Sequence, residues 1–477
     1  MTCRNLKSAY ENHSIVSSYL QKEKCQGRIL GPFPEPPYPI FRCNPIGIVP
    51  KKAAGKFRTI VNLSAPKGIS INDFISKEDF SLSYVTIDKA IDFILELGKG
   101  CFLSKVDIVD AFRIMPVSPH QWHLLGLSWD NLFYVDTRLS MGSRSSPFIF
   151  DSLSVALEWI CMHNYELRFL CHLLDDFLAA ESIVEKGNAL SVIRYVFHLL
   201  GIPLVPEKLE GPATRLEFLG ITLDTILLEA SLSVEKIEAL KDKLRSFLGK
   251  KKASKRDLLS LIGSLSFACK VVVPGRRFLS RLIALSCSVR ELHFMVYLNT
   301  QVKYDIQLWL GFLQDWNGRN FFLDRFFLTS VDLDFYTDAC EIGYGGFLAG
   351  TWFAEIWLPH QQDWSMPCKE LYPIMIATII WGARFSGKRV LVHCDNLPVV
   401  NFLNKGYTSR EPAATMLRKI TLSAMSNNFA LRCVHIEGAK NTFADLLSRQ
   451  RIAEFLAMCT YADKEPTAIP QELKMAL

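Results

Sequence analysis

HLLDDFLAA, residues 172–180, places two adjacent aspartates between short apolar runs. This pattern is typical of a β-hairpin whose turn carries Asp175 and Asp176. A lone aspartate pair is common in solvated turns, so its meaning depends on the rest of the chain. Upstream, KVDIVDAFRIMPV (105–117) puts Asp107 near the end of a strand-like run. A strand end and a neighbouring hairpin turn predict that these three carboxylates face one another.

Four further acidic residues lie in apolar surroundings in the last third of the chain. An unpaired charge is costly to bury there. Clustered carboxylates become tolerable when they share divalent cations, and two metals about 4 Å apart stabilise both oxygens of an in-line phosphoryl displacement. Two clusters therefore predict two phosphoryl-transfer centres. The second set is expected to comprise Asp338 at a strand end (FYTDACEIGYGG), Glu370 at the start of a helix (CKELYPI), Asp395 at another strand end (VHCDN) and Asp445 on a late helix (NTFADLLSR).

Composition narrows the class of protein. With 477 residues, 49% hydrophobic and 21% charged, the chain is expected to fold into about two to four domains. A net charge of +6 fits a nucleic-acid partner, although many metabolic enzymes carry a similar excess. The apolar run 372–383 is too short to span a bilayer, so no membrane partner is expected.

The cysteines and the N-terminus bear on the compartment. Thirteen cysteines occur without any C-x-x-C spacing, which excludes a zinc knuckle or ribbon. Their odd number and scattered spacing predict reduced thiols, as in the cytoplasm or nucleus. The N-terminus, MTCRNLKSAYENHSIV, lacks the apolar core of a signal peptide, so secretion is not expected.

The order of helical and strand-like stretches predicts five segments. Residues 1–40 are expected to form a leader with a polar helical start, extended by the prolines of GPFPEPPYPI. Strands and helices alternate over 41–235, and 236–330 is helical and basic. Over 331–455 the expected order is three strands, then helix, strand, helix, strand and helix, followed by a tail at 456–477.

Six segments, taken in order, resemble the fingers and palm of a reverse transcriptase over about residues 40–290. The resemblance is greatest to DIRS-type retrotransposons, through FRCNPIGIVPKK (41–52), LDDFL (174–178) and ADLLSR (444–449). It implies that the basic 236–330 stretch is a thumb that follows phosphates, although a solvated helix face has the same composition. The six segments are KKAAGKFRTIVNLSAP (51–66), VDIVDAFRIMPV (106–117), LSMGSRSSPFIF (139–150), LLDDFL (173–178), GIPLVPEKL (201–209) and LEFLGITLD (216–224).

This resemblance implies roles for individual residues. Asp107 and Asp175 would hold metal ions, with Asp176 completing the cluster. Phe112 would lie under the sugar and exclude a 2′-hydroxyl. The residues implied to bind substrate are Lys51 and Arg58 on the triphosphate, Asp110 in the triphosphate pocket, Phe112 at the sugar, Met141 and Gly142 in the motif that usually has Gln or Phe before its glycine, and Lys208 as a proton donor to pyrophosphate.

Some positions leave alternatives open or depart from the family. A salt-bridged surface lysine explains Lys208 equally well. The turn at 218–220 resembles the primer grip. The family usually has Tyr where this chain has Leu173, which implies weaker contact with the primer strand.

Residues 331–455 resemble a ribonuclease H domain, through TDACEIGYGG (337–346) and HIEGAKNTFADLLSR (435–449). The resemblance implies that Asp338, Glu370, Asp395 and Asp445 bind metal at one sheet edge. His435 is interpreted as structural. Asn396 and Asn441 either touch substrate or cap helices.

Together these features predict a multidomain α/β and α+β protein, with a right-hand polymerase of fingers, palm and helical thumb followed by a ribonuclease H-like mixed sheet. The expected activities are RNA- and DNA-directed DNA synthesis and cleavage of RNA in RNA–DNA hybrids. Each site would use two Mg²⁺ ions, with Mn²⁺ as an alternative. The expected partners are an RNA template, a DNA primer, an RNA–DNA hybrid, deoxynucleoside triphosphates and an element-encoded tyrosine recombinase.

Two alternatives compete with this interpretation. A domesticated or inactive copy would bind nucleic acid without catalysis, and the seven carboxylates argue against it. A gypsy-type or pararetroviral polymerase is the other. An aspartic protease D-[ST]-G upstream or a zinc-bearing integrase downstream would favour a gypsy-type element, whereas a nearby tyrosine recombinase would favour the DIRS type.

Overall fold

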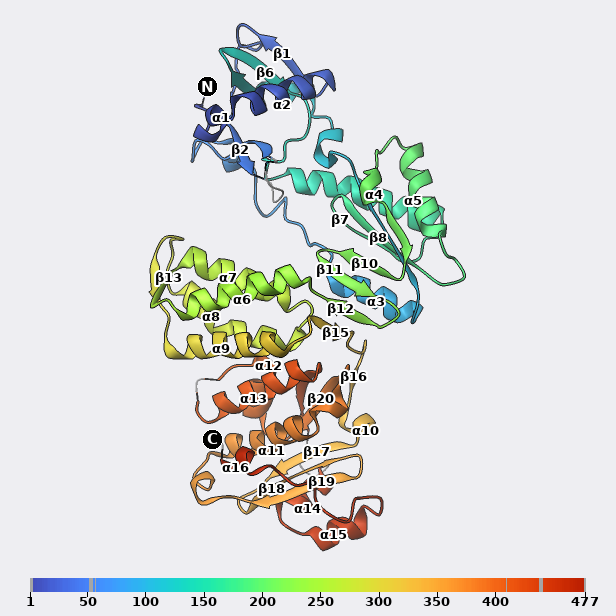
Figure 1. The fold of residues 1–477 in the computed structure, drawn as a ribbon, viewed down its shortest axis with the longest axis vertical. Helices are drawn as coiled ribbons and strands as arrows, with labels where there is room; N and C mark the ends of the chain where they lie inside the picture. The colour runs from blue at the N-terminus through green and yellow to red at the C-terminus, as the bar shows by residue number, and fades with distance from the viewer. Residues whose placement is uncertain (1–2, 51–54, 56, 409, 437–440, 476–477) are drawn as a thin grey trace. The chain divides into compact units, whose positions relative to one another are not determined.

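The computed structural model describes residues 3–50, 55, 57–408, 410–436 and 441–475. The chain divides into two compact units, residues 1–216 and 217–477 (Figure 1). The boundary falls within a strand rather than at 235/236, and the finer division into five segments stays a prediction. Among the described residues, none of the helices combines the length and apolar character needed to cross a bilayer.

The first unit begins with two helices, where the sequence predicted a polar helical start, and β1 follows at the proline-rich stretch. Ala9, Val16 and Leu20 are buried and pack with Ile29 and Trp129, which explains why the polar segment folds. Strands β1, β6 and β5 form an antiparallel sheet in that order, and β2 pairs with β3. The elements are α1 (Lys7–Glu11), α2 (His13–Cys25), β1 (Ile29–Phe33), β2 (Ile46–Pro50), β3 (Phe57–Val61), β5 (Gly126–Trp129) and β6 (Leu132–Asp136).

The rest of the first unit is a four-stranded antiparallel sheet that carries the aspartates. Its order is β7-β8-β4-β9. Helices α4 and α5 lie beside β7 and β8 (Figure 1), and the core between helices and sheet includes Val106, Phe150, Phe177 and Phe197. Strand β8 carries a continuous apolar run, Phe177 to Ala180, and is buried along nearly its whole length, as is typical of a central strand covered on both faces. The elements are α3 (Ile87–Leu97), β4 (Phe102–Asp107), α4 (Ser146–Asn164), β7 (Leu170–Leu173), β8 (Asp176–Glu181), α5 (Asn188–Leu199) and β9 (Glu210–Ala213).

The second unit opens with a small sheet and a helical bundle. Leu219 and Gly220 have φ angles of 50° and 78°, so they form a tight hairpin turn between β10 and β11 at the expected primer-grip position. Leu244, Leu261, Leu265 and Trp309 fill the interior of the bundle. The elements are β10 (Arg215–Phe218), β11 (Ile221–Asp224), β12 (Glu229–Ser231), α6 (Val234–Leu248), β13 (Lys252–Ser254), α7 (Lys255–Ala268), α8 (Ser280–Cys287), β14 (Met295–Tyr297), α9 (Thr300–Asp315) and β15 (Arg319–Phe321).

The C-terminal part of this unit contains the expected strands and helices in the expected order, and it also has the helices α10, α13 and α15, which were not predicted. Strands β17-β18-β19 are antiparallel, β16-β20-β21 are parallel, and β17 lies against β20. The elements are β16 (Phe327–Leu328), α10 (Ser330–Leu333), β17 (Phe335–Ala339), β18 (Gly343–Leu348), β19 (Thr351–Ile356), α11 (Met366–Ile380), β20 (Arg389–Cys394), α12 (Leu397–Lys405), α13 (Ala413–Ser426), β21 (Ala430–His435), α14 (Thr442–Ser448), α15 (Ile452–Met458) and α16 (Gln471–Met475).

One expectation for this part is wrong. Helix α11 begins at Met366 rather than at Glu370, because Ser365 takes the N-cap position and Pro367 the first turn. The predicted C-terminal tail, 456–477, contacts the core. Ile469 is buried in the main core, and Tyr372 donates a hydrogen bond to the Leu473 carbonyl at 3.3 Å.

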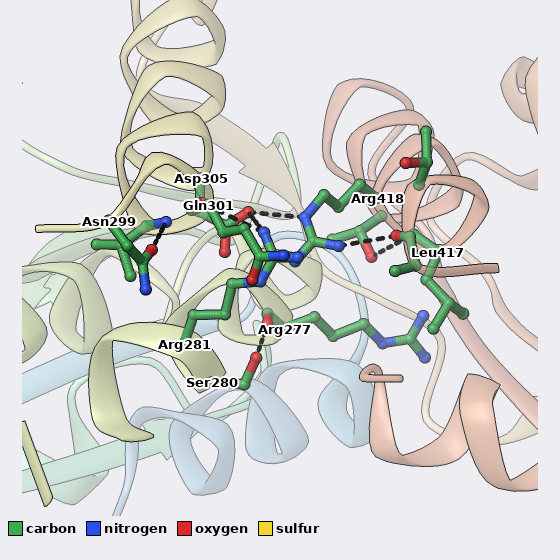
Figure 2. A network of polar contacts seen from close by, with 12 residues as sticks. Arg277, Ser280, Arg281, Asn299, Gln301, Asp305, Leu417 and Arg418 are labelled. Atoms are coloured by element: carbon green, nitrogen blue, oxygen red, sulfur yellow. Dashed lines mark hydrogen bonds and ion pairs between the residues drawn. The ribbon is translucent and has the colours of Figure 1, made fainter. Parts of the chain in front are cut away.

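A buried ion cluster joins α8 and α9 to α13 (Figure 2). Asp305 Oδ1 accepts from Arg418 Nε at 2.8 Å and from Arg281 Nη1 at 3.3 Å. Nearby, Arg277 donates to the Leu431 carbonyl at 2.6 Å. The helical bundle and the C-terminal sheet are therefore tied by polar contacts as well as by apolar packing.

Candidate catalytic centres

The first cluster stands where β4 meets the β7–β8 hairpin. Asp107 is the last residue of β4 and lies opposite Asp176, the first residue of β8. Leu174 has a φ angle of 55°, which turns the chain sharply before Asp175. The Asp175 carbonyl accepts a hydrogen bond from the Ile108 amide at 3.1 Å, so the turn is fixed to the end of β4.

Burial and mutual repulsion act on these carboxyl groups. The pKa of Asp176 is raised to about 6, chiefly by burial; Lys105 lowers it, and Asp107 and Asp175 raise it. Burial and Asp107 also raise the pKa of Asp175. Lys208 donates to Asp107 Oδ2 at 2.5 Å, and this bond raises the pKa of Lys208. Because lysine only partly offsets three acids, this oxygen-only donor set fits a hard divalent cation such as Mg²⁺.

The cluster opens into a cavity of about 960 Å³. Met141 and Arg58 are exposed, whereas Phe112 is partly buried. Asp176 is not among the lining residues, although it is only partly buried. Lys51 lies outside the described residues. Of the residues predicted from the sequence, those lining the cavity are Arg58, Asp107, Asp110, Phe112, Met141, Gly142, Asp175 and Lys208.

Two lining positions are set by close packing. The Phe112 ring rests on Phe150 of α4, with ring centroids 5.2 Å apart. A Cβ atom on Gly142 would lie 2.1 Å from the Val61 carbonyl oxygen, so only glycine lets this loop approach β3. Asn72 holds the same loop, because its side chain donates to the Gly142 carbonyl at 2.9 Å. Sequence reasoning missed Asn72, which stands in no motif.

The N-terminal helix was also missed as a component of this site. Lys22 and Glu23 of α2 line the cavity. Glu23 accepts from Arg113 at 2.8 Å, and Arg28 pairs with Asp110 at 2.8 Å. Asp110 is exposed and has a φ angle of 50°. Charged residues at helical spacing resemble a solvated face, so this pattern gave no signal of their role.

The second cluster gathers acids from four elements. Asp338 lies on β17 and Glu370 on α11, and they are 8% and 6% exposed. Asp395 directly follows β20, and Asp445 lies on α14. Burial raises the pKa of Glu370 to about 9, with further contributions from Asp338 and Asp395. Burial raises the pKa of Asp338 to about 6, and Asp395 and Asp445 add to it. These repulsions place the four acids in one neighbourhood.

Donor spacing differs between the clusters. In the part of the chain that the structure describes, Glu370, Cys394 and Asp395 form the one group of three acidic, cysteine or histidine residues whose ligand atoms all lie within 4.8 Å of one another. The carboxylate oxygens of Asp107, Asp175 and Asp176 do not all lie within 4.8 Å of one another. The carboxylates of the second cluster, Glu370 among them, suit a hard cation and therefore fit Mg²⁺. Cys394 was not predicted, although it stands next to Asp395 in the sequence.

Neighbouring side chains orient the second cluster. Ser448 donates to Asp338 Oδ2 at 2.6 Å, and Arg449 donates to Asp445 at 2.8 Å. His435 Nε2 lies 3.1 Å from the Asp395 carbonyl oxygen, which is the backbone contact expected of a structural histidine. Asn441 donates to the Thr337 carbonyl at 2.9 Å and thereby ties the start of α14 to β17.

Comparison with known proteins gives a likeness of fold. No family profile matches the sequence, and no curated protein matches it. Two structures of foamy viral protease–reverse transcriptase with double-stranded DNA superpose with TM-scores of 0.53 and 0.51, at 15% and 16% identity. They cover 91% and 92% of this chain, and 70% and 85% of theirs. A third, with an RNA/DNA hybrid, gives a TM-score of 0.52 at 14% identity over 91% of this chain and 54% of that one. The chain thus has a mixed α/β fold of the retroviral reverse transcriptase type.

Proposed function

We propose that this chain is a retroelement DNA polymerase, directed by RNA and by DNA, with a second centre that hydrolyses RNA in RNA–DNA hybrids. The observation that carries the proposal is the meeting of Asp107 and Asp175 at a cavity whose wall also includes Phe112 and Arg58. The fold likeness supports it, because the foamy viral enzymes were solved with double-stranded DNA and with a hybrid.

At the first centre, Asp107 and Asp175 would hold Mg²⁺, and Asp176, opposite Asp107 on the neighbouring strand, would complete the cluster. When bound, such ions would supply positive charge that stabilises a phosphoryl displacement. Arg58 donates to the triphosphate of the incoming nucleotide, and a flat guanidinium suits two phosphate oxygens. Lys208 is positioned beside Asp107 and carries a proton that it can give to the pyrophosphate leaving group.

At the second centre, Asp338, Glu370, Asp395 and Asp445 would hold Mg²⁺. Ser448 keeps the Asp338 carboxylate turned toward the cluster through its 2.6 Å hydrogen bond. Such a centre would recognise the 2′-hydroxyls and the helical shape of a hybrid rather than its base sequence.

The subfamily and the partners belong to the proposal as well. FRCNPIGIVPKK, LDDFL and ADLLSR favour a DIRS-type element, which pairs its polymerase with a tyrosine recombinase. Template RNA, primer DNA and deoxynucleoside triphosphates are the proposed ligands, and the cytoplasm and nucleus are the proposed compartments.

A double dissociation on the full chain tests the two centres. Asp175→Asn should lower primer extension on an RNA template by at least about a hundredfold, since a lost metal ligand removes several kcal/mol of charge stabilisation. Hybrid cleavage should persist in this variant. Glu370→Gln should instead lower cleavage of RNA in hybrids and retain primer extension.

Asp79→Asn provides the control, because Asp79 is exposed and belongs to neither cluster. It should retain both activities. Primer extension at the wild-type rate in Asp175→Asn would show that the polymerase assignment is wrong. Hybrid cleavage at the wild-type rate in Glu370→Gln would show the same for the second centre.

A further inference from the structure

Cys394 stands among the acids of the second cluster. It is the last residue of β20 and is 4% exposed. Its Sγ, a Glu370 carboxylate oxygen and an Asp395 carboxylate oxygen all lie within 4.8 Å of one another. Three potential ligands of two chemical kinds thus converge on one point.

The mixture of donors has a consequence for metal choice. Mg²⁺ demands oxygen ligands in near-ideal octahedral geometry and gains little from sulfur. Zn²⁺ binds thiolate and carboxylate in the same four-coordinate site, and thiolates favour soft cations over hard ones. Ligand atoms around a tetrahedral zinc are roughly 3.5 Å apart. Atoms already within 4.8 Å need only a small closure to reach that spacing.

The surroundings of the thiol also suit a bound cation. The backbone N–H of Asn396 donates a hydrogen bond to Cys394 Sγ at 3.5 Å. This donor can stabilise the negative charge that the sulfur carries when it binds a metal ion. Glu370 is nearly buried, and Asp338 adds further negative charge to the same neighbourhood. A divalent cation would offset this concentration of acids.

We propose that Cys394 is a metal ligand of the second centre, and that with Glu370 and Asp395 it binds a thiophilic divalent cation, Zn²⁺ or Cd²⁺, which competes with Mg²⁺. The metal–sulfur bond forms as the thiol proton leaves to solvent. The binding itself does not require the proposed ribonuclease activity, whereas its inhibitory effect on RNA cleavage rests on that function.

The alternative role for Cys394 is apolar packing, because it belongs to the main core of this part of the chain. A matched control separates the two roles. Cys433 lies on the neighbouring strand β21, is 1% exposed and is in the same core, but it is outside the group of three. Replacing either thiol by serine perturbs the core similarly, and only one replacement removes the proposed ligand.

The experiment titrates the metal-depleted full chain with Cd²⁺ and follows the near-ultraviolet charge-transfer absorbance of the cadmium–thiolate bond. Wild type and Cys433→Ser should share one tight step that moves to higher Cd²⁺ concentration when Mg²⁺ is added. Cys394→Ser should lose the step or weaken it by roughly tenfold or more. Equal steps in Cys394→Ser and wild type would overturn the proposal.

Two further arms cover misfolding and the ribonuclease function. If Cys394→Ser melts without a cooperative transition, the cadmium titration of Glu370→Gln becomes the test. This variant keeps the thiol but loses a carboxylate ligand, so it should weaken the cadmium-binding step. An unchanged cadmium-binding step in Glu370→Gln would overturn the proposal. In hybrid cleavage with Mg²⁺, added Zn²⁺ should inhibit wild type at roughly tenfold lower concentration than Cys394→Ser. A Cys394-dependent cadmium step in a protein that cleaves no hybrid would leave the metal site standing and remove the ribonuclease function.

Discussion

Phe112 is the residue proposed to select the sugar of the incoming nucleotide. Its ring lines the cavity with Asp107 and rests on Phe150, so it cannot easily move aside. We expect Phe112→Val to raise ribonucleotide incorporation relative to deoxynucleotide by on the order of tenfold or more, because a removed steric group in a pocket has about that effect on discrimination. Single-nucleotide extension with each triphosphate measures the ratio.

Phe148→Val is the comparison variant. Phe148 lies on the same helix as Phe150 and contacts Phe80, and it is not among the residues lining the cavity. This variant should keep wild-type discrimination. An active Phe112→Val enzyme with unchanged discrimination would remove the sugar-selection role.

At the same residue scale, the sequence predicts where the backbone brings residues together better than it predicts where their side chains point. Asp107 and Asp175 could be predicted to lie close together because strand ends and hairpin turns constrain the backbone. Cys394 could not be predicted as a neighbour of Glu370, because a side chain's direction at a strand end depends on local twist. The contact of Asn72 with the loop at 142–144 depends on tertiary folding between segments far apart in the sequence.

At the scale of elements, the strongly patterned strands β17 to β20 were predictable, whereas α13 was not. Its sequence, AATMLRKITLSAMS, mixes β-branched and polar residues, and its helical state depends on packing against α11. The start of α11 at Met366 was missed because the apolar run after Glu370 gave the stronger signal. Tertiary contacts thus determine the helical state of α13, and helix-capping residues determine where α11 begins.

The ion cluster at the joint of α8, α9 and α13 gives a prediction at this scale. Asp305 is 1% exposed and lies between Arg281 and Arg418 (Figure 2). Asp305→Asn keeps the shape but leaves two buried guanidinium groups without a counter-charge. We expect the free energy of unfolding of the second unit to fall by about 3 kcal/mol, as when one partner of a buried ion pair is removed.

Urea unfolding followed by tryptophan fluorescence measures this loss, since Trp309 lies on α9. Asp242→Asn is the matched control, because Asp242 forms an exposed pair with Arg245 on α6. Its cost should be below about 1 kcal/mol. Equal unfolding curves for Asp305→Asn and wild type would show that the joint is held by apolar packing alone.

At the scale of the whole molecule, the ordered motifs predicted a reverse-transcriptase-type fold that structural comparison supports. The placement of the compact-unit boundary at 216/217 was not predictable. Sequence motifs can be recognised because the chemistry of a site requires particular residues. The boundary between two compact units depends instead on how many contacts form within each unit, which the sequence does not show. The helical start of the chain was predicted, but its packing was not: Val16 and Leu20 of α2 are buried with Ile29 of β1 although the helix is mostly polar.

The carboxylates of the second cluster give a prediction for the stability of the fold, with and without metal. Burial with Asp338 and Asp395 raises the pKa of Glu370 from 4.5 to about 9. Between these values, the folded metal-free protein holds a proton that the unfolded chain has released. Stability then falls as pH rises, at a rate of at most about 1.4 kcal/mol per pH unit for one group. The contribution is complete below the unfolded pKa and is lost as pH approaches about 9.

Glu370→Gln removes this titration while keeping the shape. In EDTA, the variant should melt at a higher temperature than wild type, and the difference should widen as pH rises from about 5 to about 9. Mg²⁺ should stabilise wild type more than the variant, because the cation takes the place of the proton among the acids. Circular dichroism melting curves, recorded with EDTA and with Mg²⁺, measure both differences. Melting temperatures that differ by a constant amount at every pH would mean that Glu370 is not the buried, proton-holding group at this centre.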